Sequence, residues 1–292
     1  MNMNFMPAFE AATTQAEYEI KSFAEAAASY IEHGGEAKYL DEVLPHIGDK
    51  MLSRIFSFDV QQLANQLKPE ASNATKNRCV VTPIRAVCNH GHERGWGPVG
   101  RIKAFKMERP KRKDPASPAW IMTFLRQCDK DGLPHLAALV LFMSKTGARV
   151  SEAIALCWSE VDLARRTALL LKTKTERNSI RHMSEQLVSR LSEMRVGAGE
   201  DDRVFGYRNR HSVNDRIRAV CERAEITYKP SHTCGRHAYA TNTLAMGMDI
   251  KSTMDAGGWR SISIFLGTYV NPHDAGRAVA ARHSMFDFQN AL

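Results

Sequence analysis

The chain has 292 residues, of which 43% are hydrophobic and 25% charged, as expected of a folded soluble protein long enough for two domains. Its formal net charge of +8 at pH 7 favours a polyanionic partner over an acidic small molecule. No apolar run approaches the ~20 residues of a membrane span, and the N-terminus lacks the basic start and apolar core of a signal peptide.

The six cysteines include no CxxC pair, and most fall within apolar helical patterns, where a free cysteine behaves as a small hydrophobic residue. This usage favours a reduced, cytoplasmic protein over a disulfide scaffold. One grouping resembles a metal site: Cys88, His90 and His92. It lacks a second pair of ligands, so the sequence predicts no structural metal there.

The N-terminal third of the chain predicts a small helical domain. Residues 1–17 are expected to be a flexible lead-in, and residues 18–98 to form the domain itself. Helices are expected over residues 22–33, 39–46, 55–67 and 73–89. Gly34, Gly48 and Pro69 stand after the first three of them, where glycine and proline commonly end a helix.

The helix predicted over residues 73–89 has a polar and basic stripe opposite an apolar one. The stripe consists of Arg78, Thr82, Arg85 and Asn89. A solvated face is the usual explanation of such a stripe. If a DNA-handling domain follows, contact with DNA phosphates becomes a better explanation of the stripe. Lys76, Arg78 and Arg85 are then the candidate DNA contacts.

Residues 99–114 are rich in proline, glycine and cations and lack apolar periodicity, which predicts a basic linker between two domains. Lys103 and Lys106 are among its cations. A charged linker can simply be solvated, but the same cations can follow a DNA backbone, with ~1 counterion released per contact.

Residues 115–292 predict a second, mainly helical domain with a C-terminal tail. Helices are expected over residues 120–128, 134–144, 150–157, 184–194 and 212–223, with a short tail helix from Ala275. Ser212 is expected to cap the helix that it begins. Residues 168–183 predict a β-hairpin, two short strands around a polar turn. The fold class is therefore mainly α with a small hairpin or sheet (α+β).

An arginine and a glutamate head the groups that could do chemistry. Arg149 follows a glycine turn at a predicted helix start, and Glu152 comes one turn later, where its carboxylate can brace the guanidinium. An arginine fixed in this way donates bidentately to phosphate oxygens, which lysine cannot imitate. A purely structural Arg–Glu pair is the alternative explanation.

A stretch near the C-terminus contains further candidate groups. His232 and His237 flank Arg236, a Gly-Gly-Trp sequence ends at Trp259, and Tyr269 follows about one short helix later. A cation that binds a phosphate group, together with a phenol that can attack the phosphorus, would form a phosphoryl-transfer site. Tyr239 lies inside a predicted helix, where an aromatic residue is most often part of the core.

These motifs together resemble those of the tyrosine recombinase (phage integrase) family. In family order the chain has TGARVSE, a lysine in a β-turn, GRHAYAT, Gly-Gly-Trp and a late tyrosine. The resemblance covers about residues 115–283 and extends more loosely to the helical half before them. It implies a helical core-binding domain over residues 18–98 and a catalytic domain over residues 115–292.

The resemblance also implies roles for individual residues. Arg149 and Arg236 correspond to the two catalytic arginines, and Tyr269 corresponds to the nucleophile. Lys174 corresponds to the hairpin lysine, with Lys172 as the alternative. A further correspondence is that of Trp259, which stands where the family has histidine or tryptophan.

The chain departs from the family pattern at the histidine. The family spaces its histidine and second arginine as His-x-x-Arg, but Thr233 occupies that register here and His232 comes one residue earlier. The role of the family's histidine is assigned to His232, with a neighbouring residue as the alternative. One inserted residue in the preceding loop could bring the side chain of His232 back to the position of that histidine. The interval from Trp259 to Tyr269 is also one residue longer than the commoner spacing.

The activity implied by the resemblance is site-specific DNA cleavage and rejoining through a covalent 3′-phosphotyrosine. No metal or ATP is expected, in agreement with a sequence that has no carboxylate cluster for Mg²⁺ and no GxxxxGK[ST] loop. The implied partners are double-stranded DNA, a homotetramer on two paired sites and, as a candidate, an accessory DNA-bending protein. A prophage or another mobile element is the expected source. The alternatives are a type IB topoisomerase and a catalytically inactive DNA-binding regulator on the same fold.

Overall fold

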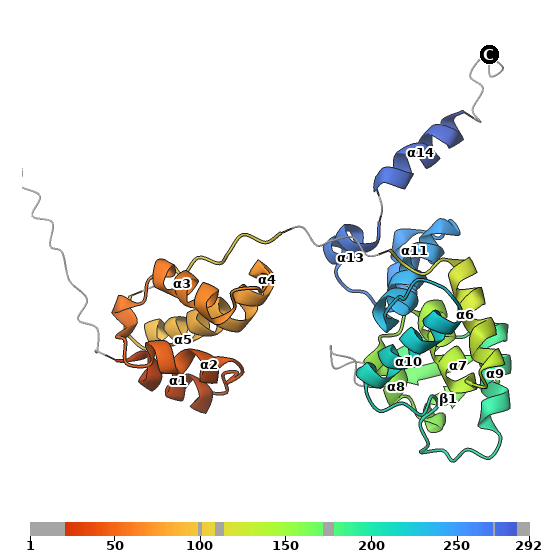
Figure 1. Ribbon diagram of the computed structural model, residues 1–292, viewed down its shortest axis with the longest axis horizontal. Coiled ribbons are helices and arrows are strands. Elements are labelled where there is room, and N and C mark those ends of the chain that lie inside the picture. The colour runs from red at the N-terminus through yellow and green to blue at the C-terminus, as the bar shows by residue number, and fades with distance from the viewer. Residues whose placement is uncertain (1–20, 99–100, 109–113, 172–177, 271, 285–292) are drawn as a thin grey trace, which may run out of the picture. The chain divides into compact units, whose positions relative to one another are not determined.

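The computed structural model describes residues 21–98, 101–108, 114–171, 178–270 and 272–284. The chain divides into two compact units, Met1–Lys111 and Arg112–Leu292, each with a hydrophobic core of its own (Figure 1). No helix among the described residues is long and apolar enough to cross a membrane.

The first unit is helical, and its helices confirm those predicted from the sequence. The elements are α1 (Phe23–Glu32), α2 (Leu40–Ile47), the 3-10 turn η1 (Leu52–Arg54), α3 (Ser57–Leu67), α4 (Asn73–Lys76), the π turn η2 (Asn77–Val81) and α5 (Thr82–Glu93). Ser22 begins α1 with a capping box, in which its hydroxyl accepts from the backbone N–H of Glu25 and its own N–H donates to the Glu25 carboxylate. The stretch α4–η2–α5 forms one continuous helical run.

Part of the predicted linker packs on the first unit. Ile102 is buried in its core, and the hydroxyl of Ser57 donates to the carbonyl of Arg101. Asn77 exchanges two hydrogen bonds with the backbone of Phe105. Residues 101–107 therefore belong structurally to the first unit, because helix side chains satisfy backbone groups that a linker would leave to water.

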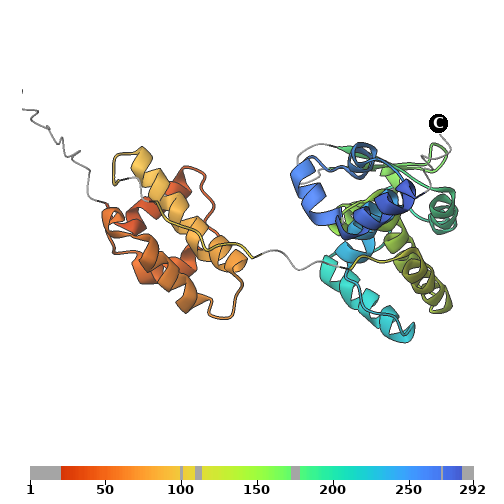
Figure 2. The ribbon, with the colours of Figure 1, turned by 90° about the horizontal axis from the view of Figure 1, so that it is seen from above.

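The second unit places a small sheet against a helical core. Its elements are α6 (Pro118–Lys130), α7 (Pro134–Thr146), α8 (Val150–Ala155), η3 (Trp158–Glu160), β1 (Val161–Asp162), β2 (Thr167–Leu170), β3 (Ser179–His182), α9 (Glu185–Arg195), α10 (Arg210–Arg223), the π turn η4 (Thr233–His237), α11 (Ala238–Ala245), α12 (Ile250–Gly257), α13 (Ile262–Tyr269) and α14 (Pro272–His283). Helices α6 and α10 lie side by side (Figure 2).

Helix α7 is the centre of the second core. Every residue from Leu136 to Met143 is buried, which confirms the prediction of a helix that is apolar on all sides. It ends at Gly147, whose φ of 69° lies in the left-handed region that favours glycine. A Cβ at this position would come within 2.9 Å of the Tyr239 ring, so the turn into α8 also requires the missing side chain.

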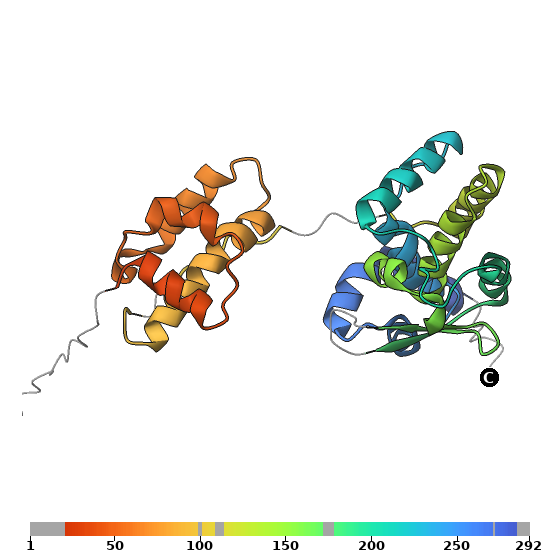
Figure 3. The same cartoon turned by 90° about the horizontal axis from the view of Figure 1, so that it is seen from below.

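The sheet is antiparallel, in the order β1-β2-β3, and lies along one edge of the second unit (Figure 3). Strands β2 and β3 pair from Thr167 with His182 to Leu170 with Ser179, which confirms the predicted hairpin. Strand β1 was not predicted, because two residues are too few to produce an alternating pattern.

The predicted cap of α10 is wrong. The helix begins at Arg210, and the side chain of Asn209 accepts hydrogen bonds from the backbone N–H groups of His211 and Ser212. Ser212 lies in the first turn, where its hydroxyl donates to the carbonyl of Asn209. Both residue types cap helices well, and here the earlier one does so.

Candidate active site

A pocket of about 990 Å³ opens on the second unit where five segments meet. These segments are the start of α8, strand β3, the start of α10, the region around η4 and the stretch from the end of α12 through α13. Basic and aromatic side chains from all of them line it: Arg149, Arg181, Arg210, His211, His232, Arg236, Trp259, Arg260 and Tyr269. The lining has more cations than carboxylates and therefore suits an anion.

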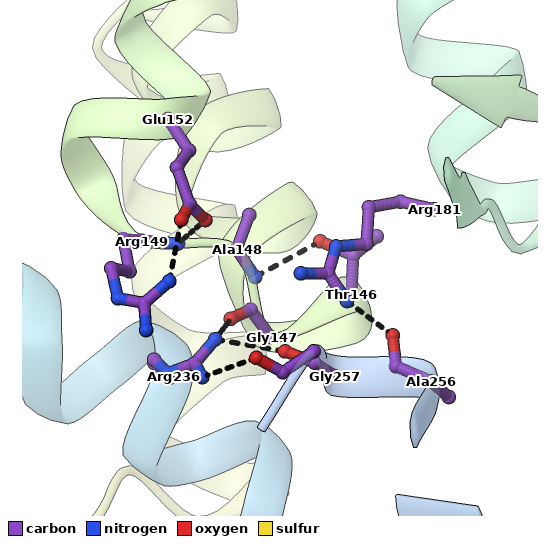
Figure 4. Close-up of polar contacts among 10 residues, drawn as sticks. Thr146, Gly147, Ala148, Arg149, Glu152, Arg181, Arg236, Ala256 and Gly257 are labelled. Carbon is purple, nitrogen blue, oxygen red and sulfur yellow. Dashed lines mark hydrogen bonds and ion pairs between the residues drawn. The ribbon is translucent and has the colours of Figure 1, made fainter. Parts of the chain in front are cut away.

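Arg149 is braced as the sequence predicts (Figure 4). Its backbone N–H donates to Oε2 of Glu152 at 2.9 Å, and its NH1 donates to Oε1 at 2.6 Å. The Glu152 side chain is 5% exposed, whereas that of Arg149 is 37% exposed. A buried carboxylate thus orients a guanidinium that still faces the pocket.

Arg236 is buried and held by backbone carbonyls (Figure 4). Its NH1 donates to the carbonyls of Gly147 and Gly257, and its NH2 donates to that of Gly258 at 3.4 Å. Its Cζ lies 3.6 Å from the centroid of the Trp259 ring, a close cation–π contact. Burial, followed by repulsion from Arg149, lowers the pKa of Arg236 to about 10, so the guanidinium remains charged at neutral pH.

Tyr269 is the last residue of α13 and is 8% exposed. Its ring packs edge-on against those of Trp259 and His237, with centroid distances of 5.2 and 4.6 Å. Trp259 therefore contacts both the second arginine and the tyrosine, and the structure brings Arg149, Arg236, Trp259 and Tyr269 to one pocket.

His232 reaches the same pocket through an irregular helical turn. It is exposed and lines the pocket, whereas Thr233 is buried. The next turn, η4, is a π turn, which is one residue wider than an α turn. This wider turn lies between His232 and the residues that follow Arg236, and both side chains line the pocket despite the additional residue between them.

The hairpin lysines cannot be placed, since Lys172 and Lys174 lie outside the described residues. Among the described residues, no group of three or more His, Cys, Asp or Glu side chains is arranged to hold a metal ion.

Four of the five basic residues that are candidate DNA contacts lie at or near the surface of the first unit. Arg78, Lys103 and Lys106 are exposed, and Lys76 donates to the side chain of Asn65 at 2.8 Å. Arg85 differs, because its Nε and NH2 both donate to the carbonyl of Ile102, at 3.1 and 2.7 Å. This contact gives Arg85 a structural role that the sequence did not predict.

Four basic residues of the pocket were missed in the sequence: Arg181, Arg210, His211 and Arg260. Arg210 and His211 stand at the start of α10 and Arg260 follows Trp259, and nothing in the local pattern distinguishes these three from solvated residues. Arg181 left no signal in the sequence, because strand alternation would place the apolar Ile180 inward and the charged Arg181 outward. The structure shows the reverse, with Ile180 60% exposed and Arg181 2% exposed. A charged residue on the buried side of a strand is unusual.

Known proteins with this sequence pattern and fold are recombinases and integrases. A protein of Haemophilus influenzae assigned to the integrases/recombinases is 23% identical over 249 residues, which cover 81% of this chain and 80% of that protein. The integrase of Salmonella phage P22 is 25% identical over 213 residues, or 66% of this chain and 52% of that protein, so the chain spans about half of its length.

Solved structures agree on the fold. A fragment of the Tn1549 transposon integrase, in complex with circular intermediate DNA, superposes with a TM-score of 0.69 at 18% identity, covering 89% of this chain and 99% of that one. A lambda integrase dimer bound to a core site gives 0.62 at 13% identity, over 85% and 77% of the two chains. The predicted fold class, mainly α with a small sheet, is confirmed.

The family model extends over residues 119–275, more than half of the chain and all of the pocket. Its span begins inside α6 and ends inside α14, so it includes both arginines, the Gly-Gly-Trp turn and the tyrosine. The chain belongs to the phage integrase family.

Proposed function

We propose that the protein is a site-specific DNA recombinase that cleaves and rejoins DNA through a covalent 3′-phosphotyrosine on Tyr269. The observation that supports this most directly is the convergence of Arg149, Arg236, Trp259 and Tyr269 on one cation-rich pocket. A phosphodiester is the anion that two fixed guanidiniums and a phenol would act on together.

In the proposed reaction the phenolic oxygen of Tyr269 attacks the scissile phosphorus. A P–O bond to tyrosine forms, the bond to the 5′-oxygen breaks, and the tyrosine proton passes to water. Arg149 and Arg236 stabilise the additional negative charge on the nonbridging oxygens of the transition state. Lys174 supplies the proton that the departing 5′-oxygen needs, and His232 assists by hydrogen bonding or proton transfer.

Rejoining is the reverse of these steps. A 5′-hydroxyl attacks the phosphotyrosine, the bond to Tyr269 breaks, and the phosphodiester is restored. Because the covalent intermediate conserves the energy of the broken bond, the reaction proceeds without ATP. The same two guanidiniums serve in both directions, because the two transition states carry the same charge.

Double-stranded DNA is the proposed partner; the solved Tn1549 integrase fragment is in complex with circular intermediate DNA. The first unit, including residues 101–107, serves as a core-binding domain and residues 115–292 as the catalytic domain, and four protomers act on two paired sites. An accessory DNA-bending protein is a further candidate partner. The element that encodes the protein is a prophage or a similar mobile element, and the reaction takes place in the cytoplasm.

A nicked substrate tests the proposed function. With a nick close to the cleavage point, the short cleaved strand diffuses away and the covalent adduct accumulates. We expect a protein–DNA band that resists denaturation, formed in EDTA and without ATP. Absence of the band with intact DNA binding would indicate an inactive DNA-binding regulator, and relaxation of supercoiled DNA without a second site would indicate a topoisomerase.

The exposed cations of residues 101–108 give a second prediction. Replacing Lys103 and Lys106 with alanine should reduce the slope of log Kd against log salt concentration by up to ~2, because each phosphate contact releases about one counterion. Fluorescence anisotropy across a salt series measures the slope.

Lys68→Ala is the matched control within the same unit. Its ammonium lies 2.6 Å from the carboxylate of Glu42, so its charge is already neutralised by the chain. An unchanged slope for Lys103→Ala/Lys106→Ala, or an equal change for the control, would remove these lysines from the DNA-binding surface.

A further inference from the structure

Arg181 is a buried guanidinium that belongs to none of the sequence motifs above. It is 2% exposed and projects from β3 toward the second core. Its NH1 donates to the carbonyl of Ala256, and its Nε, although buried, donates to no atom of the described residues. The side chain also lines the pocket that contains Arg149 and Arg236.

Such a position is energetically unfavourable for a cation. Burial is the largest cause that lowers the pKa of Arg181, and among the described residues its side chain forms no ion pair. Glu152 acts in the opposite direction, but both of its oxygens already accept from Arg149. A leucine or methionine would fill a buried strand position without this cost, so packing alone does not explain an arginine here.

Arg181 contacts the C-terminal end of α12. Three consecutive carbonyls at this end accept from guanidiniums: that of Ala256 from Arg181, and those of Gly257 and Gly258 from Arg236 (Figure 4). The last carbonyls of a helix have no intrahelical donor and carry partial negative charge, which suits cations.

The contact is close enough to constrain the sequence of the turn. A Cβ on Gly258 would lie 2.4 Å from NH2 of Arg181, and Gly258 has a φ of 66°. The turn can therefore approach Arg181 only as glycine. The residue that follows it is Trp259, whose ring stacks on Arg236.

We propose that Arg181 is a positioning residue for Arg236. By fixing the carbonyl of Ala256, it fixes the two carbonyls that follow, and these orient the guanidinium of Arg236 above the ring of Trp259. The strand β3 thereby supports the phosphate pocket from the side opposite Arg149. This role rests on the proposed function, because it concerns the orientation of a group in the same site.

The test is a double-mutant cycle on single-turnover cleavage of the nicked substrate. Arg181→Met should lower the cleavage rate by roughly 10- to 100-fold, since a misplacement of ~1 Å can have an effect of that size, with little change in Kd for the DNA. In an Arg236→Lys background the same substitution should lower the rate less than about 3-fold, because the group that it positions is already gone.

Two further variants make the result specific. Arg190→Met is the control, because it removes an arginine whose partner, Asp129, lies outside the pocket; its rate should match that of the unmodified protein. Arg181→Lys keeps a donor for the Ala256 carbonyl and should recover part of the rate. It also takes the place of Arg181→Met in the cycle if the thermal melting curve shows that the methionine variant does not fold.

Each outcome decides the question. Equal losses in the two backgrounds would mean that Arg181 acts independently of Arg236, and an unchanged rate for Arg181→Met would mean that it has no part in cleavage; both overturn the inference. If the unmodified protein forms no adduct at all, the proposed function fails and the role of Arg181 falls with it. The two failures are therefore distinguishable.

Discussion

Replacement of Tyr269 with phenylalanine should abolish the covalent protein–DNA adduct while leaving DNA binding within about 3-fold of its original strength. The substitution removes only the nucleophilic oxygen, and the ring that packs against Trp259 and His237 is retained. Without a nucleophile no covalent intermediate can form, so the loss should reach the detection limit. Denaturing gels of the nicked substrate and anisotropy of the intact site measure the two quantities.

Tyr239→Phe is the matched control for this experiment. Tyr239 is 7% exposed and its ring stacks on that of Trp259, with a centroid distance of 5.9 Å. Tyr239→Phe also removes one phenolic oxygen next to Trp259, and this variant should still form the adduct. An adduct retained by Tyr269→Phe would identify another nucleophile, and loss of binding together with the adduct would make Tyr269 a structural residue.

Arg149→Lys should reduce the rate of adduct formation by roughly 10²–10³-fold, the size of effect seen when one charge-stabilising donor is removed from a transition state. Lysine keeps the positive charge but not the planar fork. Its compact ammonium cannot donate to Glu152, as the guanidinium of Arg149 does, and also present two parallel donors to a phosphate. Single-turnover kinetics at saturating protein separate this effect from weaker binding.

Arg166→Lys is the control for the same chemical change. Arg166 pairs with Glu185 on the surface, where both side chains are more than half exposed, and lysine can replace it there with little effect. A near-normal rate for Arg149→Lys would exclude Arg149 from the phosphate pocket and reduce the Arg149–Glu152 pair to a structural ion pair.

The helices of both units were predictable because their signals are local. Apolar periodicity sets each helix, and Gly34, whose φ of 86° lies in the left-handed region that favours glycine, follows the end of α1. The errors also arise locally, where two signals compete. Asn209 and Ser212 can both cap a helix, and only the start at Arg210 decides between them.

Features that depend on contacts distant in sequence were not predictable. The segment that contains Ile102 has no periodicity, and it is held by Ser57, Asn77 and Arg85 from other elements. Arg181 is similar, because its partner Ala256 is 75 residues away.

The candidate site was predictable in part. Arg149, Glu152 and Tyr269 were identified because their motifs are short and ordered along the chain, and the geometry of the Arg149–Glu152 pair followed from helix spacing alone. The cage of carbonyls around Arg236 was not predictable, since it is formed by backbone atoms of Gly147 and Gly257, which are distant from Arg236 in sequence.

The π turn over Thr233–His237 has a consequence for how relatives of this chain are recognised. A pattern search that demands a fixed interval between histidine and arginine would reject this sequence at His232, although both residues line the same pocket. Because of this one wide helical turn, the number of residues between the histidine and the arginine does not determine how far apart they lie in space. Relatives with an extra residue at this point should therefore be sought by superposing backbones, because counting residues back from the arginine would miss their histidine.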